Sequence, residues 1–503
     1  MPAKRALSAA LALLLVAAIP ARAANVPTIT VVDTIRPGNA SSSAMDLGEA
    51  AALNGYLYFA AQDGVHGVEL WRTNGTTTTL VEDINAGDGG QDNSNPQQLT
   101  VLGDYLYFNA DDGTHGVELW RTNGTTTTEL VKDINSHFSQ DSDPACFTEF
   151  KGYLYFQATD GEFGHELWRT NGTMTELVAD INATGDGAGS SSPCGFATFS
   201  ATFGDFLFFS AYDGTSGYEL WRTDGLVTSR VWDVNQGAAS SFPTELTVFG
   251  DHLYFVANEG IDEPGTRGYE LWRTDGNLAE LVFDINVGGD SYPTDFNTLG
   301  GWLYFTANDG THHSELWRSD GTTTEMVDEI NSTGGSYPYA AAVLGEWLYF
   351  SAIDDTHGDE LWRSNGTITE LVANINVTAD EGSGPDSFTP LGDWLYFQAN
   401  DATGDNTLWR SDGTTTEQIP FPAAGQYINC DCYETNIAAA GGRLFTTVWS
   451  SDIGYEFAYL DEPTYVLPET NRLASVWATT LVILAGLTAA ASIGLRVRGA
   501  KRA

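Results

Sequence analysis

Aspartates in glycine-containing turns are the residues of this sequence with the clearest capacity for chemistry. Five of them occupy equivalent places in a recurring segment, namely Asp63, Asp112, Asp160, Asp213 and Asp309. Turns rich in carboxylates can supply the oxygen ligands that Ca²⁺ prefers, so these five aspartates are calcium candidates. Asp-Gly is also ordinary turn chemistry, and the ligand spacing of the EF-hand loop is absent. Calcium is therefore the one cofactor candidate, and the sequence establishes no cofactor with certainty.

Histidine, glutamate and arginine also recur with the segment. His66, His115, His165, His312 and His357 share one turn in five copies, whereas a catalytic base normally has surroundings of its own. We therefore expect a structural role for these histidines. The repeated Glu-Leu-Trp-Arg, as in Glu118 to Arg121, predicts Glu–Arg ion pairs within or between copies, because buried charges need partners. Motifs of serine hydrolases, zinc proteases and nucleotide-binding proteins are absent, so a protein without catalytic activity is favoured over an enzyme.

The chain contains four cysteines, Cys146, Cys194, Cys430 and Cys432. Cys146 and Cys194 each follow a proline and precede an aromatic strand in consecutive copies, which makes them candidates for a disulfide. Cys430 and Cys432 are separated by one residue and could form a local bridge or pair elsewhere. A zinc site is less expected, because CxC without a nearby histidine is poor ligand spacing.

The recurring segment is typical of short antiparallel strands. In the copy at 103–134, Tyr105 to Phe108 and Glu118 to Arg121 have the composition of strands, and Asp112-Gly113 lies between them. Asn123-Gly124 predicts a hairpin with a type I′ turn before a third strand at 128–134. A fourth strand is expected at 98–102, before the segment. Four short antiparallel strands in each copy predict one blade of a β-propeller.

The number of copies predicts the size of the propeller. Eight tryptophans of the repeat follow one another at intervals of 45–53 residues, at Trp71, Trp120, Trp168, Trp221, Trp272, Trp317, Trp362 and Trp409. A ninth, degraded copy lies at 454–459. Residues 28–35 resemble the last strand of a copy, and we expect them to complete the ninth blade and close the ring. An all-β, single propeller of nine four-stranded blades is favoured. Eight blades with a flanking piece, or two smaller propellers, are the alternatives.

The two ends of the chain predict export and a membrane anchor. Residues 1–23 have the basic start, apolar run and small-residue cleavage site of a secretory signal peptide. The propeller would then span 24–462, followed by a juxtamembrane linker at 463–472. Residues 473–495 carry no charge and are long enough for a transmembrane helix. The basic tail at 496–503 predicts a cytoplasmic C-terminus, with the propeller outside the cell.

A short motif precedes the expected helix. Leu467, Pro468, Glu469 and Thr470 match the start of the LPxTG sorting pattern, but Asn471 replaces its glycine. The arrangement resembles the C-terminal sorting signals of bacterial surface proteins. A plain anchor that no enzyme cleaves is the alternative.

The formal charge of the chain is −45. Such a surface repels nucleic acids and anionic membranes, so a nucleic-acid partner is not expected. The expected partners are an extracellular protein or carbohydrate, and the lipid bilayer through the C-terminal helix.

Units such as NDGTHHSELWRSDGTTTEMV resemble the ELWxxDGT repeats of bacterial exported proteins, which are sometimes labelled hyalin-like. This resemblance implies a surface β-propeller and brings no established catalytic residues. We therefore expect a membrane-anchored binding or adhesion module at the cell surface. The alternatives are an extracellular hydrolase or lyase with a site in the central channel, and a non-catalytic coat protein. Unique residues for either task would be sought at 185–192, at 259–267 and in the stretch around Cys430 and Cys432.

Overall fold

The computed structural model describes residues 27, 29–31, 35, 49–87, 92–137, 140–183, 189–201, 204–260, 267–377, 382–401, 403–404, 406–421, 437–450 and 454–461. All of them belong to one compact unit, Val26–Asp461. A second unit, Met1–Asn25 with Glu462–Ala503, contains no described residue. The expected signal peptide, sorting motif and transmembrane helix therefore lie outside the described residues. Within the described ranges, no helix is long and apolar enough to cross a membrane.

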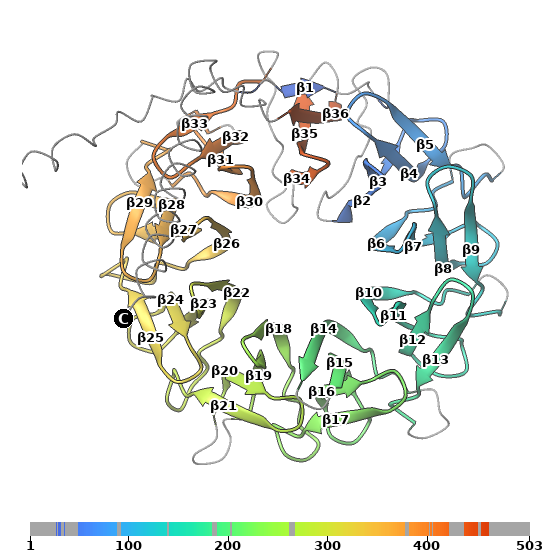
Figure 1. Ribbon diagram of the computed structural model, residues 1–503, viewed down its shortest axis with the longest axis horizontal. Coiled ribbons are helices and arrows are strands. Elements are labelled where there is room, and N and C mark those ends of the chain that lie inside the picture. The colour runs from blue at the N-terminus through green and yellow to red at the C-terminus, as the bar shows by residue number, and fades with distance from the viewer. Residues whose placement is uncertain are drawn as a thin grey trace, which may run out of the picture. The chain divides into compact units, whose positions relative to one another are not determined.

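Nine antiparallel sheets of four strands each form the blades, and Figure 1 shows them arranged as a ring. The first strands lie innermost, and they are β2 (Ala51–Leu53), β6 (Gln97–Leu102), β10 (Ala145–Phe150), β14 (Cys194–Ala201), β18 (Thr244–Phe249), β22 (Thr294–Leu299), β26 (Tyr339–Leu344), β30 (Asp386–Leu391) and β34 (Ile437–Ala440). The second strands are β3 (Tyr56–Gln62), β7 (Tyr105–Asp111), β11 (Tyr153–Ala158), β15 (Gly204–Tyr212), β19 (His252–Asn258), β23 (Trp302–Asn308), β27 (Trp347–Asp354), β31 (Trp394–Asn400) and β35 (Arg443–Ser450).

The third strands carry the ELWR motif in blades 1 to 7, and they are β4 (Val68–Thr73), β8 (Val117–Thr122), β12 (Glu166–Thr170), β16 (Tyr218–Thr223), β20 (Tyr269–Thr274), β24 (Ser314–Ser319), β28 (Gly358–Ser364), β32 (Asn406–Ser411) and β36 (Gly454–Asp461). The fourth strands are β5 (Thr78–Glu82), β9 (Thr128–Lys132), β13 (Thr175–Ala179), β17 (Thr228–Trp232), β21 (Ala279–Phe283), β25 (Thr324–Asp328), β29 (Thr369–Ala373), β33 (Thr416–Gln418) and β1 (Ile29–Val31). We number the blades 1 to 9 in chain order, from β2–β5 to β34–β36 with β1.

The N-terminal strand closes the ring as the sequence predicts. β1 pairs with β36, so the ninth blade has the order β1-β36-β35-β34. Ile29 is buried among Ile437, Leu444 and Leu460 of that blade. The backbone N–H of Ile35 donates to the buried carboxylate of Glu456 at 3.0 Å. The prediction of nine blades is therefore confirmed.

The hydrophobic core lies between consecutive blades, which explains the uninterrupted apolar run of the second strand. In blade 1, Leu57 and Phe59 pack with Phe445 of blade 9, whereas Tyr58 packs with Leu106 of blade 2. Alternate side chains of a strand point to opposite faces of its sheet. Because each blade is covered on both faces, both sets of side chains are apolar.

The two faces of the ring carry different connections. One face, called the linker face, holds the Asp-Gly turns between second and third strands and the linkers between blades, as in 83–96. The other, called the hairpin face, holds the remaining turns of each blade. There the predicted type I′ turn at Asn123-Gly124 is wrong, because Gly124 has a positive φ and Asn123 does not. The Asn123 side chain instead accepts the backbone N–H groups of Thr125 and Thr126 at 3.0 and 2.9 Å.

Candidate functional site

The repeated Asp-Gly turns are hydrogen-bonded within themselves. Asp112 Oδ1 accepts the backbone N–H groups of Thr114 and His115 at 2.9 and 2.8 Å, and its Oδ2 lies 2.7 Å from His115 Nδ1. Burial alone would raise the pKa of Asp112, but the hydrogen bonds from His115 and Thr114 lower it below its usual value. Asp63 and Asp309 have the same arrangement with His66 and His312.

The other two calcium candidates also accept backbone N–H groups of their own turns. Asp160 accepts those of Glu162 and Phe163, and Asp213 accepts those of Thr215 and Ser216. Among the described residues, no group of three or more His, Cys, Asp or Glu side chains is arranged to hold a metal ion. These carboxylates serve the turns of the linker face, and calcium at any of the five stays a prediction.

The predicted Glu–Arg pairing is wrong. Glu118 is fully buried and accepts the backbone N–H groups of Ile134 and Asn135 at 2.8 and 3.3 Å and the hydroxyl of Ser142 at 2.6 Å. Arg121 instead pairs with Glu129 of the fourth strand. Residues three apart in a strand point to opposite faces of the sheet, so Glu118 and Arg121 cannot meet within one blade.

The serine partner belongs to a Ser-x-Pro motif that sequence reasoning missed. The same Glu–Ser bond occurs in seven blades, between Glu69 and Ser94, Glu118 and Ser142, Glu166 and Ser191, Glu219 and Ser241, Glu270 and Ser291, Glu315 and Ser336, and Glu360 and Ser383. The sequence contains a signal for this pairing, because a proline follows each of these glutamates at a similar distance along the chain. In blade 8, Thr407 replaces the glutamate and accepts Trp409 Nε1 at 2.9 Å.

These Glu–Ser pairs predict a dependence of stability on pH. Burial raises the pKa of Glu118, Glu219 and Glu270 to about 7 in the folded protein, despite their hydrogen bonds. The unfolded chain has the lower, ordinary pKa, so the folded state binds more protons between the two values. Stability is therefore lost as the pH rises through this window. We expect the free energy of unfolding to fall from pH 5 to pH 8 by about 1–3 kcal/mol for each glutamate.

Chemical denaturation at pH 5, 6, 7 and 8 measures this dependence. The triple variant Glu118→Gln/Glu219→Gln/Glu270→Gln should have a flatter profile than the unchanged protein. A free energy of unfolding that stays constant or increases over this range would show that the carboxyls are ionised throughout.

Cys146 and Cys194 form a disulfide with a Cα–Cα distance of 5.5 Å. Cys146 lies on the innermost strand of blade 3, beside a β-bulge. Near the equivalent positions of blades 1 and 2, a side chain accepts a hydrogen bond from the backbone of the next blade. Gln98 of blade 2 accepts the backbone N–H of Cys146 at 2.9 Å, and Glu49 of blade 1 accepts that of Gln98 at 2.7 Å. The disulfide thus continues a series of links between innermost strands. Cys430 and Cys432 lie outside the described residues, as do Leu467, Pro468, Glu469 and Thr470.

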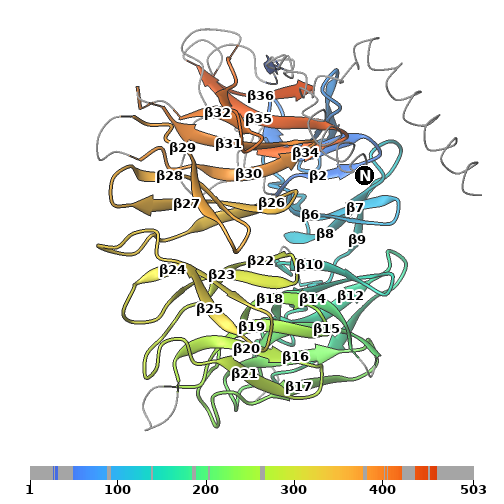
Figure 2. The same cartoon turned by 60° about the vertical axis from the view of Figure 1, so that its left-hand side comes forward.

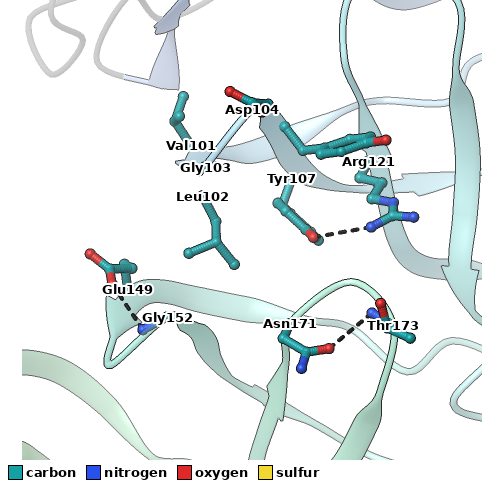
Figure 3. Close-up of a pocket in the computed structure, with 11 residues that line it drawn as sticks. Val101, Leu102, Gly103, Asp104, Tyr107, Arg121, Glu149, Gly152, Asn171 and Thr173 are labelled. Carbon is teal, nitrogen blue, oxygen red and sulfur yellow. Dashed lines mark hydrogen bonds between the residues drawn. The ribbon is translucent and has the colours of Figure 1, made fainter.

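A recess on the hairpin face lies between blades 2 and 3 and has a volume of about 680 Å³. Figure 3 shows its residues, among them Leu102, Tyr107, Arg121 and Asn171. The Arg121 guanidinium lies 4.4 Å from the ring centre of Tyr105 and donates to Tyr107 Oη at 3.4 Å. The same Arg–aromatic stacking recurs in most other blades, for example between Arg169 and Tyr153. A motif repeated around the ring is part of the scaffold, so this recess is a weak candidate for a specific site.

Departures from the repeat are concentrated at the linker face of blades 5 to 8, whose strands from β18 to β32 are labelled in Figure 2. The middle residue of Ser-x-Pro has a positive φ in every copy. It is Asn95, Asp143, Ser192 or Gly384 in four linkers, and of these types glycine, asparagine and aspartate tolerate this conformation well. In the three consecutive linkers that lead into blades 5, 6 and 7 it is Phe242, Tyr292 and Tyr337, with φ of 46°, 43° and 46°. We call these three residues the aromatic arc.

The side chains of the arc are exposed, at 46% for Phe242, 57% for Tyr292 and 52% for Tyr337. Phe242 stacks on Tyr218 and Tyr292 on Tyr269, with ring centres 5.6 and 5.2 Å apart. Bulky residues with positive φ are strained, and exposed rings gain little from the hydrophobic effect. The fold therefore does not explain why aromatic residues occupy these positions, and they are the main candidate for a binding surface.

Two carboxylates on the innermost strands follow residues of the arc closely in the sequence. Glu245 follows Phe242, and Asp295 follows Tyr292, each three residues later in the chain. Burial and the neighbouring charge of Asp295 raise the pKa of Glu245, although the backbone of Asp295 and Phe296 donates to it. Within the arc itself, the Asp290 carboxylate lies beside the Tyr292 hydroxyl.

Blade 7 holds a buried polar cluster that the repeat does not contain. Tyr339 Oη donates to Asp359 Oδ2 at 2.7 Å, and Ser351 Oγ donates to Asp359 Oδ1. Burial raises the pKa of Asp359 and of Asp386 in blade 8, and the charge of Asp359 adds to the rise at Asp386.

The insertions proposed from the sequence are only partly described. In 185–192, Ser191 belongs to the Glu–Ser pairs. In 259–267, Arg267 bridges Glu259 and Asp284 at 2.9 and 3.2 Å. The aromatic arc was not recognised, because Phe242, Tyr292 and Tyr337 read as ordinary linker residues until their exposure is known. Its signal is an aromatic residue where the other copies have Asn, Asp, Ser or Gly.

The sequence matches no family model and no curated protein. Similar solved structures include a prolyl endopeptidase from an analysis of two such enzymes, at 11% identity and a TM-score of 0.39, covering 82% of this chain and 55% of that one. Puromycin hydrolase is similar at 11% identity and a TM-score of 0.35, with 72% and 59% covered. The β-propeller domain of the Trilobed protease from Pyrococcus furiosus is similar at 11% and 0.34, with 65% and 97% covered. The chain thus spans little more than half of the first two proteins, and similarity at this level carries no information on function.

Proposed function

We propose that this chain is an extracellular binding module that holds a carbohydrate on the linker face of blades 5 to 7. The aromatic arc carries this proposal. Flat, rigid aromatic rings are favoured in binding surfaces because they provide contact area at a low cost in conformational entropy. Strained and exposed residues of this kind also cluster where ligands bind. Sugars suit such a surface, since their apolar faces stack on rings and their hydroxyls donate to carboxylates.

The charge of the chain restricts the class of saccharide that can bind. With a formal charge of −45, the protein repels anionic ligands. A neutral or basic saccharide is therefore favoured over an acidic one. Asp290 accepts the backbone N–H of Tyr269 at 2.8 Å and lies beside Tyr292. Its carboxylate is one acceptor for the hydroxyl groups of the saccharide.

A hydrolase is the second candidate, and Asp359 and Asp386 are the carboxyl pair that it would use. Both oxygens of Asp359 accept hydroxyl groups of the protein itself, from Tyr339 and Ser351. This internal use of the carboxylate favours a structural role over proton transfer to a substrate. Binding without catalysis is therefore our preferred function.

Cell-surface attachment is part of the same proposal. The resemblance to ELWxxDGT repeat proteins, the signal-like residues 1–23 and the apolar stretch at 473–495 support export and anchoring in the membrane. Adhesion would follow if the bound saccharide belongs to another cell or to a matrix.

The test is binding of the protein to a glycan array, followed by titration with the saccharide that gives the strongest signal. Tyr292→Ala should weaken binding at least tenfold, because it removes a central ring of the surface. Leu226→Ala is the matched control, since Leu226 is 91% exposed on the hairpin face of blade 4. Equal effects of the two substitutions, or cleavage of the saccharide during the titration, would contradict the proposal.

A further inference from the structure

Blade 7 shows how three positions at the linker end of a blade come into contact. Tyr339 begins β26 and lies opposite Ser351 of β27, and Asp359 lies on β28 next to both. The two hydroxyls donate to the one carboxylate, at 2.7 Å from Tyr339. The cluster therefore contains matched donors and acceptors.

Blade 8 places a carboxylate and two amides at these three positions. Asp386 lies opposite Gln398, as Tyr339 lies opposite Ser351. In blade 7, Asp359 lies two residues before Leu361, the residue that pairs with Ser351. In blade 8, Asn406 lies two residues before Leu408, the residue that pairs with Gln398, so Asn406 and Asp359 are equivalent. Side chains at these positions share one face of the sheet and are close enough to interact.

One side-chain oxygen of each of the three blade 8 residues lacks a donor. The Gln398 side chain forms a hydrogen bond with Asp386, which leaves Asp386 Oδ1, Gln398 Oε1 and Asn406 Oδ1 buried without a hydrogen-bond partner. The Gln398 side chain is 1% exposed and that of Asn406 is 9% exposed. A buried acceptor without a donor costs about 1–3 kcal/mol, and here three of them occur at one place.

We infer that Asp386, Gln398 and Asn406 form a binding site for a hard metal cation, either Ca²⁺ or Na⁺. Carboxylate and amide oxygens are the ligands that such cations prefer, and a cation would satisfy all three acceptors at once. The nearby charge of Asp359 increases the attraction. The site differs from the Asp-Gly turns in chemistry, because its oxygens are not occupied by the backbone. It does not depend on the proposed carbohydrate function.

The test is isothermal titration of the full chain, freed of metals by a chelator, with CaCl₂ in choline chloride and again in NaCl. We expect one site whose affinity for Ca²⁺ falls at least tenfold in Asp386→Asn. Asp251→Asn is the matched control, since the Asp251 side chain is 94% exposed and lies away from blade 8, and its affinity should be unchanged. If the site holds Na⁺ instead, NaCl should raise the melting temperature above that in choline chloride, and Asp386→Asn should remove this difference.

A second variant distinguishes loss of a ligand from misfolding, because it is expected to gain affinity. Asn406→Asp restores the residue type of Asp359 at the equivalent position and adds a negative ligand, so it should bind Ca²⁺ at least threefold more tightly than the unchanged protein. The inference is overturned if neither cation binds, if Asp386→Asn keeps full affinity, or if Asp251→Asn abolishes binding.

Discussion

Replacement of Glu118 by alanine is expected to lower the free energy of unfolding by about 3–5 kcal/mol. The carboxylate accepts two backbone N–H groups and the Ser142 hydroxyl in a fully buried position. Alanine would leave these donors without partners, and each buried donor costs about 1–3 kcal/mol. The linker between blades 2 and 3 would lose the contacts that hold it.

Urea denaturation followed by tryptophan fluorescence measures this loss. Glu129→Ala is the matched control within the same blade, because Glu129 is 44% exposed and pairs with Arg121 at the surface. Exposed ion pairs contribute about 0–1 kcal/mol, so the control should change stability little. Similar losses in both variants would mean that the Glu–Ser pairs do not stabilise the ring.

Replacement of Ile29 by aspartate is expected to destabilise the ring by about 4 kcal/mol or more, because it places a charge in an apolar core. Ile29 is 3% exposed and packs with Ile437, Leu444 and Leu460. Detachment of β1 would also expose the edge of β36, and exposed strand edges promote aggregation. The variant should therefore unfold at lower urea concentration and elute partly as aggregates from size-exclusion chromatography.

Thr30→Asp is the control for this substitution. Thr30 is the next residue of β1 and its side chain is exposed, so the same charge is added on the solvent side of the same strand. It should leave stability within about 0.5 kcal/mol of the unchanged protein. Equal behaviour of the two variants would contradict closure of the ring by β1.

The architecture could be predicted because local patterns determine it. Tyr105 to Phe108 reads as a buried strand, the tryptophan spacing identifies eight of the nine blades, and residues 28–35 resemble a missing fourth strand. The partners of the buried glutamates could not be predicted in the same way. Glu118 bonds Ser142, which lies 24 residues later in the chain, and such a contact depends on how the linker after β9 folds back over the blade.

The candidate site was predictable only in principle. Tyr292 and Asn95 stand at the same position of the Ser-x-Pro motif, but the left-handed conformation and the exposure that make Tyr292 unusual are properties of the folded linker. Prediction of the blade 8 cation site would require even more structural information. Asp386, Gln398 and Asn406 lie on three different strands, and only the strand register brings them together.

The most direct test of the account is a side-by-side binding measurement on two triple variants. One carries Phe242→Ser, Tyr292→Ser and Tyr337→Ser, and the other carries Asn95→Ala, Asp143→Ala and Ser192→Ala at the same motif position in other linkers. The account predicts that the first variant loses saccharide binding at least a hundredfold, while the second retains it and both remain folded by circular dichroism. Retained binding in the first variant, or an equal loss in both, would contradict a ligand site on the aromatic arc.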